Sequence, residues 1–185
     1  MAERDAEIAK AKEADAKIIA AEAVDRDKYI ASHKLILKTT PSGLKYAVTK
    51  ASVKPKPQKG DTVLVNYTGR SLDDKVFDSS VESVAKAAGL NEPGRTFEPY
   101  PVIVGTGGVI PGWDEGLLLL NEGSKAIFVI PSSLGYGSHG SGAVRPYSTM
   151  VFDIEVVKVK PIKHPAPPPA TKKPVHKKTT KKKKS

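Results

Sequence analysis

The middle of the chain consists of short segments in which apolar and polar residues alternate, separated by turn residues. In the clearest of them, Thr149–Lys160, one face of an extended chain would carry Met150, Phe152, Ile154 and Val156. A two-residue period is that of a β-strand, and several short strands with hairpin-like turns favour antiparallel pairing. Strand segments are likewise predicted at 44–50, 61–68, 76–77, 100–104 and 125–130.

Helical segments in this region are few and short. Residues 81–88 are predicted to form a helix that Ser79 or Ser80 caps and Gly89 ends, and a second helix opens on Pro111 or Gly112. The predicted fold class is α+β, an antiparallel sheet of about five to six strands wrapped around a short α-helix. The Ser/Gly-rich loop 132–148 is too long for a simple connection, which favours a functional role.

Residues 1–38 are predicted to form an N-terminal helical extension before the domain at 39–160. Residues 2–35 contain no glycine or proline and are rich in Ala, Glu and Lys, which are strong helix formers. Their apolar residues form only a loose stripe without a heptad, which argues against a long coiled coil. Two interpretations stay open: a helix that forms a homodimer or docks a partner, or a solvated helix packed at one edge of the domain.

Residues 161–185 form a basic tail that is predicted to be disordered. The tail holds nine lysines and no acidic residue, and subtracting these nine from the net charge of +10 leaves +1 for residues 1–160. A Lys/Pro/Ala-rich segment without aromatic residues buries too little apolar surface to fold. We expect the tail to bind nucleic acid through phosphates, to bind an anionic membrane or acidic protein, or to act only as a solubilising segment.

Composition excludes several classes of site and sets expectations for the compartment. The chain has no cysteine, so disulfides and thiolate metal sites are excluded, and no motif for a hydrolase triad, a phosphate-binding loop or a zinc protease occurs. No apolar run approaches the length of a transmembrane segment. The charged N-terminus predicts a cytoplasmic protein, with a periplasmic location as the alternative if a signal peptide has been removed.

Aromatic residues near predicted turns are the candidates for a binding site. The single tryptophan, Trp113, follows the run Gly105–Gly108 at the predicted start of a short helix. It is either a core residue or the floor of a pocket. Aromatic side chains that converge with a few polar groups are typical of an apolar ligand pocket. The other members of this set are Tyr67, Phe77, Tyr100, Tyr136 and Phe152.

Five short motifs occur in the order and approximate spacing of one known family. They are Asn66–Gly69, Val76–Ser80, Gly105 through Val109–Gly116, Gly135–Gly137 and Val151–Glu155. Each motif is weak alone, but the five in order are specific. Over about residues 43–160 the chain resembles the FKBP-type (macrolide-binding) peptidyl-prolyl cis–trans isomerases.

The resemblance implies an isomerase that rotates X–Pro bonds of proline-containing polypeptides, assists their folding and uses no cofactor or metal. It further implies inhibition by macrolides such as tacrolimus or rapamycin. Trp113 would form the pocket floor. The catalytic residues implied are Asp78, Tyr136, Tyr67, Phe77, Trp113 and Phe152, and the substrate-binding residues are Tyr100, Val109, Ile110 and Val144.

The chain departs from the family pattern at the rim of the expected pocket. The segment 79–96 is longer than in minimal members, Arg145 stands where a proline is usual, and Tyr100 replaces the usual phenylalanine. The sequence leaves open whether Asp78 positions Tyr67 or polarises the twisted amide. Two alternative functions also stay open: a proline-peptide binding module, and a chaperone-like protein that dimerises through the N-terminal helix.

Overall fold

The computed structural model describes residues 2–90 and 93–162. Its helices are α1 (Ala2–Ser32), α2 (Glu82–Ala87) and α3 (Pro111–Leu117), with one 3₁₀ turn, η1 (Ser132–Leu134). Its strands are β1 (Lys38–Thr39), β2 (Lys45–Lys50), β3 (Thr62–Arg70), β4 (Val76–Ser79), β5 (Tyr100–Ile103), β6 (Lys125–Ile130) and β7 (Met150–Lys160). Within these residues, no helix combines the length and apolar character needed to cross a membrane.

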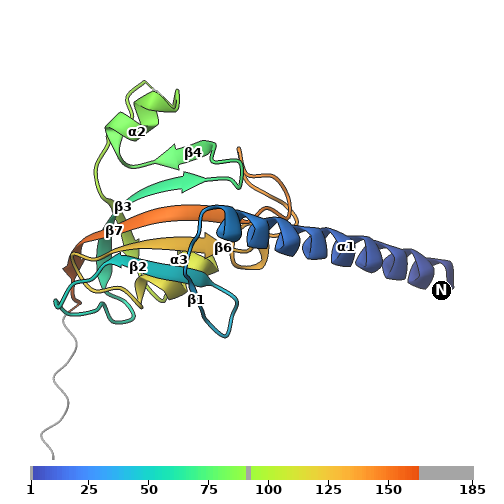
Figure 1. Cartoon of the computed structure of the whole chain (residues 1–185). Helices are drawn as coiled ribbons and strands as arrows, with labels where there is room; N and C mark the ends of the chain where they lie inside the picture. The colour runs from blue at the N-terminus through green and yellow to red at the C-terminus, as the bar shows by residue number, and fades with distance from the viewer. Residues whose placement is uncertain (1, 91–92, 163–185) are drawn as a thin grey trace, which may run out of the picture.

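The described strands form one antiparallel sheet in the order β1-β2-β6-β7-β3-β4, with β5 also paired to β3 (Figure 1). This arrangement confirms the predicted α+β class. The extra strand Lys38–Thr39 was not predicted, because two residues are too short to show alternation. Strand β3 pairs with β7 along one edge, while its other edge pairs with β5 up to Val65 and with β4 from Thr68. Tyr67 therefore lies between the stretches of this second edge that pair with β5 and with β4.

The main core lies between the sheet and α3. Strand β7 contributes the side chains that its alternation predicted, with Met150, Phe152, Ile154 and Val156 all buried. Phe128 of β6 and Leu117 of α3 are fully buried against them. Burial of apolar surface is the main favourable term in folding, so this core holds α3 against the sheet.

Helix α1 contacts the domain through Asp15 and its C-terminal third, and its N-terminal end projects away (Figure 1). Every residue from 4 to 21 is exposed, whereas Glu22 and Tyr29 are buried. Tyr29 packs with Val129 and Val151 on the sheet face opposite α3. The structure therefore agrees with the second interpretation, a solvated helix packed at one edge of the domain, while the homodimer or partner contact stays a prediction.

The predicted cap of α2 is wrong. Its N-cap is Val81, and no side chain caps the helix. The two serines bind the neighbouring strand instead: Ser80 Oγ accepts the Tyr67 N–H at 2.9 Å, and Ser79 Oγ donates to the Tyr67 carbonyl at 2.9 Å. These hydroxyls join β3 to the chain leaving β4, and Ser79 Oγ also accepts the N–H of the N-cap residue Val81 at 3.1 Å.

Candidate active site

Trp113 lies in the first turn of α3, where it is 5% exposed. The helix opens on Pro111, whose missing N–H costs nothing at this position. Two glycines let the helix approach β6 closely. A Cβ at Gly112 would lie 2.6 Å from Ile130, and one at Gly116 would lie 2.6 Å from Phe128. This close contact seats the indole against the sheet.

The glycine-rich loop before α3 is tied to the helix by one carboxylate. Asp114 accepts the Gly105 N–H at 2.6 Å and the Gly107 N–H at 3.0 Å. Both glycines have positive φ values, a backbone conformation that glycine adopts without strain. Asp114, in the first turn of α3, thus orders the loop, and the loop in turn carries Val109 and Ile110.

The aromatic rings around Trp113 meet edge to face rather than stacking. The Trp113 centroid lies 5.0 Å from that of Tyr67 and 5.3 Å from that of Phe152, with interplanar angles of 77° and 81°. Phe77 meets Phe152 in the same way at 5.7 Å. Such pairs suit the aromatic quadrupole, and rings set at right angles enclose space between them.

Gly69 is a structural requirement of this wall that the sequence analysis did not single out. A Cβ at Gly69 would lie 2.7 Å from both Phe77 and Phe152. Because glycine has no Cβ, the Phe77 and Phe152 rings can pack directly against the backbone of β3 at this position. The signal was present in the motif Asn66–Gly69, but a glycine after an alternating strand is also an ordinary strand end.

These side chains enclose a cavity of about 490 Å³. The structure brings nine of the ten predicted site residues to its lining, where the glycine loop joins them: Tyr67, Phe77, Asp78, Tyr100, Gly107, Gly108, Val109, Ile110, Trp113, Tyr136 and Phe152. Val144 is the exception. It lines a neighbouring cavity that shares Phe77, Asp78 and Tyr136. The roles given to these ten residues stay predictions.

Both carboxylate oxygens of Asp78 are already engaged. The Tyr67 hydroxyl donates to Oδ2 at 2.6 Å, and Arg95 Nη2 donates to Oδ1 at 2.6 Å. Burial raises the pKa of Tyr67 well above its ordinary value, and the bond to Asp78 raises it further, so this phenol stays protonated. Arg95, in the enlarged segment 79–96, was missed, because nothing in the sequence links it to a carboxylate in a preceding strand.

Two donors at the cavity have no partner within residues 2–90 and 93–162. The Trp113 Nε1–H is buried without an acceptor. The Tyr136 hydroxyl reaches the lining from the loop between β6 and β7, and no described side chain or backbone group bonds to it. Buried donors are nearly always paired in proteins, so the indole N–H is the unusual one, whereas Tyr136 is 40% exposed and its hydroxyl is open to solvent.

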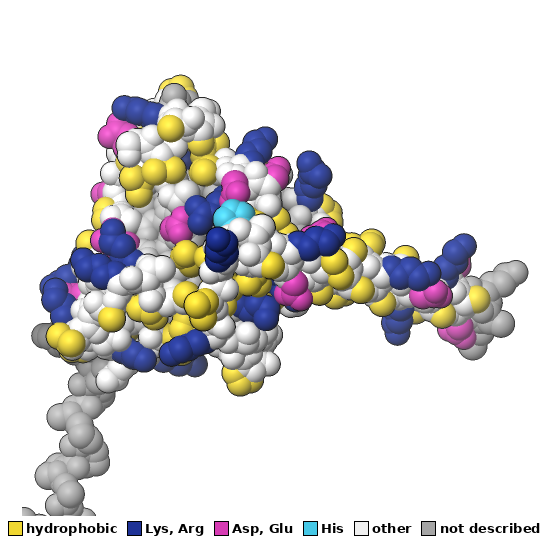
Figure 2. Space-filling view, viewed as in Figure 1, with side chains coloured by type: hydrophobic (Ala, Val, Ile, Leu, Met, Phe, Trp, Pro, Cys, Tyr) yellow, Lys and Arg dark blue, Asp and Glu magenta, His cyan; other side chains and the backbone are white. Residues whose placement is uncertain are grey.

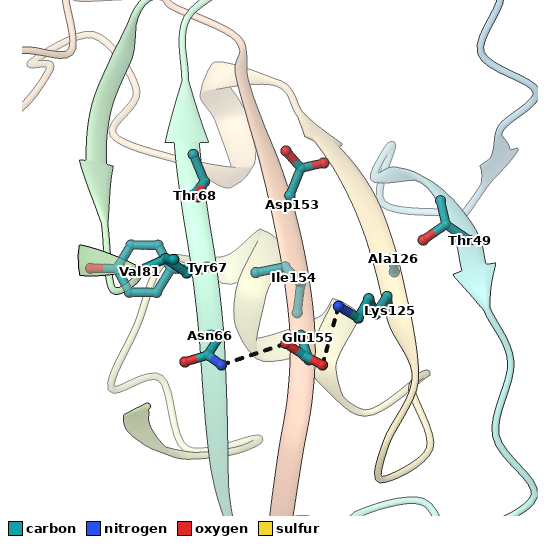
Figure 3. Close-up of a pocket in the computed structure, with 10 residues that line it drawn as sticks. All are labelled: Thr49, Asn66, Tyr67, Thr68, Val81, Lys125, Ala126, Asp153, Ile154 and Glu155. Carbon is teal, nitrogen blue, oxygen red and sulfur yellow. Dashed lines mark hydrogen bonds and ion pairs between the residues drawn. The ribbon is translucent and has the colours of Figure 1, made fainter. Parts of the chain in front are cut away.

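The outward-facing residues of the same strands line a second, polar furrow (Figure 3). Lys125 and Asn66 lie on either side of Glu155 and bond to it at 3.3 and 3.5 Å. Asp153 is likewise paired, with Arg70 at 2.6 Å. Because Lys125, Glu155 and Asp153 are already paired, the charged residues that line this furrow present no unpaired charge to a ligand. Across the described part of the chain, no three carboxylate or imidazole side chains gather as a metal site requires.

Comparison with known proteins identifies the family. A sequence profile described as FKBP-type peptidyl-prolyl cis-trans isomerase matches residues 53–157, which contain nearly the whole cavity. The chain belongs to this family. The match confirms the resemblance that the five motifs predicted.

Individual relatives agree with the family match. A probable FKBP-type isomerase FkpA of Neisseria meningitidis is 44% identical over 136 residues, which are 72% of this chain and 44% of that protein. FK506-binding protein 2 of Yarrowia lipolytica is 44% identical over 105 residues, or 56% of this chain and 64% of that protein. The crystal structure of Escherichia coli FkpA superposes with a TM-score of 0.62 at 34% identity, covering 86% of this chain and 69% of that one. The chain thus spans less than half the length of the Neisseria FKBP-type relative.

Proposed function

We propose that the chain accelerates rotation about X–Pro peptide bonds in the cavity above Trp113. The observation that carries this proposal is the cavity itself, which is walled by rings at right angles and floored by a buried indole. Its size and apolar lining suit a proline ring with its neighbours. Proline-containing polypeptides are therefore the proposed substrates, and assistance to protein folding is the proposed role.

Such a cavity can lower the barrier without a nucleophile. Rotation costs about 18–20 kcal/mol because twisting the C–N bond breaks amide resonance. The planar amide carries separated charge on nitrogen and oxygen, and the twisted amide carries less. An apolar surrounding therefore disfavours the planar ground state relative to the twisted transition state, which is differential binding of the kind that raises kcat.

The open donors supply the orientation that an apolar wall cannot. We assign the Tyr136 hydroxyl, or the Ile110 N–H at the start of α3, to the carbonyl of the residue before proline. For Asp78 we favour positioning over direct polarisation of the amide, because both its oxygens are held by Tyr67 and Arg95. In this role Asp78 keeps the Tyr67 ring upright against Trp113.

The test is isomerisation of a proline tetrapeptide together with proline-limited refolding of a protein substrate. Wild type should accelerate both, because both depend on the same bond. No acceleration of either would end the enzyme proposal and favour the alternative, a proline-peptide binding or chaperone module. Binding of the same tetrapeptide without turnover would identify that alternative directly.

Macrolide inhibition is a second part of the proposal. The similarity to FK506-binding protein 2 supports it, and the cavity is large enough for the buried part of such a ligand. Tacrolimus or rapamycin should abolish the tetrapeptide activity of wild type. Full activity at a saturating concentration of either compound would show that the rim at 79–96 or Arg145 has closed the site to macrolides.

Dimerisation through α1 is a third part. The exposed stretch 4–21 carries Ile8, Ile18 and Ile19, each 45–50% exposed among charged neighbours (Figure 2). Apolar side chains of this size on a projecting helix favour a homodimer contact. Small-angle scattering should give twice the chain mass for wild type and one chain mass for Ile18→Lys/Ile19→Lys. A monomeric wild type would remove the dimer from the proposal.

Domain bounds and location stay predictions: a helical extension at 1–38, an isomerase domain at 39–160, a tail at 161–185, and a cytoplasmic or, alternatively, periplasmic protein. The predicted nucleic-acid binding falls on residues 163–185, which lie outside the described residues. Filter binding of DNA and RNA at two salt concentrations, with the full chain and with one ending at residue 160, tests it.

A further inference from the structure

The loop that carries Tyr136 also carries Val144, and it returns to its own base. We call residues 131–149 the rim loop. Inside it, the Gly137 N–H donates to the Ser132 carbonyl at 2.9 Å, and the Tyr147 N–H donates to the Gly137 carbonyl at 2.8 Å. Ser132 and Thr149, at the two ends of the loop, are 4% and 2% exposed. The position of Tyr136 is therefore set from this buried base.

One carboxylate from α1 closes that base. Glu22 is 8% exposed and accepts three hydrogen bonds from the two ends of the rim loop. Its Oε1 accepts the Ser132 N–H at 2.7 Å and the Thr149 hydroxyl at 2.7 Å, and its Oε2 accepts the Ser132 hydroxyl at 2.6 Å. A buried charge is costly unless it is bonded in this way, and bonds to an ionised acceptor are the stronger kind.

The link between Ser132 and the cavity is short and stiff. Tyr136 follows Ser132 by four residues, three of them in η1 or its C-cap. A Cβ at Gly135 would lie 2.5 Å from Met150, so the backbone passes directly over the core at this point. A displacement of the Ser132 backbone should therefore also displace the Tyr136 side chain.

Contacts on either side of Glu22 hold α1 in place on the domain. Asp15, Glu22 and Tyr29 follow one another at seven-residue intervals, which places all three on one face of the helix. Tyr29 donates to Asp74 at 2.8 Å, beyond the end of β3, and Asp15 accepts the Tyr147 hydroxyl of the rim loop at 2.7 Å. One rigid helix thus spans the sheet and the rim loop.

We propose that Glu22 is a positioning residue of the isomerase site: α1 sets the place of Tyr136 by holding both ends of the rim loop. This inference rests on the proposed function, since it gives Tyr136 a part in turnover. It adds that the N-terminal helix is part of the catalytic domain's working structure. A change that pulls Glu22 out of its three bonds lowers activity without touching the cavity.

Variants at Glu22, Thr149 and Glu13 distinguish a role in positioning Tyr136 from a role that only attaches α1 to the domain. Glu22→Ala removes all three acceptor contacts. Glu22→Gln keeps the shape, and its amide can still accept from the Ser132 N–H and donate to the Ser132 hydroxyl. Thr149→Val removes one bond without changing shape and serves if Glu22→Ala does not fold. Glu13→Ala is the matched control, because Glu13 is exposed on the same helix and pairs only with Lys17.

Steady-state kinetics on the tetrapeptide should give a graded result. Glu22→Ala lowers kcat/KM about threefold, Glu22→Gln and Thr149→Val less than about twofold, and Glu13→Ala not at all. In a Tyr136→Phe background, adding Glu22→Ala changes kcat/KM by less than about 1.5-fold, because two changes that act through the same backbone segment are not additive. Equal effects of Glu22→Ala in both backgrounds would overturn the inference.

Hydrogen exchange supplies a measurement that does not depend on turnover. Glu22→Ala should speed amide exchange in residues 132–149 and leave the amides shared by β3 and β7 unchanged. Unchanged exchange in the rim loop would also overturn the inference. A wild type without isomerase activity would instead end the proposed function, and faster exchange in that case would still identify Glu22 as the anchor of the loop.

Discussion

The sheet packs an apolar cluster on each face, and the two clusters differ in what they leave open. On one face, Tyr67, Trp113 and Phe152 meet edge to face and surround a cavity of about 490 Å³. On the other, α1 lays Tyr29 over Val129 and Val151, both fully buried. Aliphatic side chains under a helix close completely, whereas crossed rings leave space. The same sheet therefore presents one surface for a ligand and one for its own N-terminal helix.

The largest effect should come from removing the floor of the open cluster. Trp113→Ala leaves a void next to Leu117 and the facing strands, and it should lower the free energy of unfolding by about 3–5 kcal/mol. Activity on the tetrapeptide should fall more than about 100-fold, because the amide is no longer held in place. Urea unfolding and steady-state kinetics measure the two effects. A Trp113→Ala protein with near wild-type kcat/KM would show that the cavity is not the active site.

The next effect should come from the carboxylate at the edge of the same cluster. Asp78→Ala leaves the Tyr67 hydroxyl and the Arg95 guanidinium without this acceptor, which should cost about 1–3 kcal/mol of stability. We expect kcat/KM to fall about tenfold as the Tyr67 ring loosens. Asp73→Ala, in the exposed turn after β3, is the matched control. Activity unchanged in Asp78→Ala would remove this residue from the site.

A smaller effect on activity alone should come from the open hydroxyl. Tyr136→Phe keeps the ring and removes one donor that no described residue uses, so stability should stay within about 0.5 kcal/mol of wild type. One neutral hydrogen bond to the substrate corresponds to about a five- to tenfold fall in kcat/KM. Tyr46→Phe, in β2 and outside the cavity lining, is the control. A loss of stability as large as the loss of activity would point to a structural role.

The closed cluster should give the converse result. Tyr29→Phe keeps the packing against Val129 and removes the bonds of its hydroxyl with Asp74 and Arg70, at 2.8 and 3.3 Å. We expect a loss of about 1 kcal/mol in unfolding free energy, with kcat/KM within about twofold of wild type. Thermal unfolding beside the tetrapeptide assay makes the measurement. A tenfold loss of activity in Tyr29→Phe would contradict the view that one face of the sheet serves activity and the other only stability.

The smallest effect should appear only at high pH. The pKa of Tyr67 is raised above its unfolded value of 10.0, chiefly by burial and then by Asp78. Above pH 10 the unfolded chain loses this proton while the folded chain keeps it, so stability is full below pH 10 and declines as the pH rises. The free energy of unfolding, measured with urea, should therefore fall more between pH 9 and 11 for wild type than for Tyr67→Phe. Equal declines would mean that the phenol is not shielded.

Local periodicity was enough to predict most of the sheet, and the family resemblance predicted which residues meet at the cavity. Strand β7 followed its alternation, and nine of the ten predicted residues line one cavity, eight of them within the five motifs. What failed depended on partners distant in sequence. Ser79 and Ser80 had the chemistry of helix caps, but β3 uses their hydroxyls instead. The placement of Val144 depended on the path of the rim loop, which no short pattern encodes.

The docking of α1 shows the same limit more sharply. Most of the loose apolar stripe that the sequence shows, including Ile8, Ile18 and Ile19, is exposed. The contacts that hold the helix are instead polar groups at Asp15 and Glu22, together with Tyr29. A carboxylate seven residues from another is unremarkable in a helix rich in charge. The role of these carboxylates follows only from their bonding partners, Ser132 and Tyr147, which lie more than 100 residues away in the sequence.

The undocked part of α1 has a consequence that is one of distance. Residues 4–14, which precede the contact of Asp15 with Tyr147, are exposed and helical, and at 1.5 Å per residue they extend about 17 Å. An α-helix resists shortening in a way that a flexible linker does not, so this stretch keeps the N-terminal end of α1 at a fixed distance from the domain. The helix is thus a rigid spacer at one end and an anchor at the other.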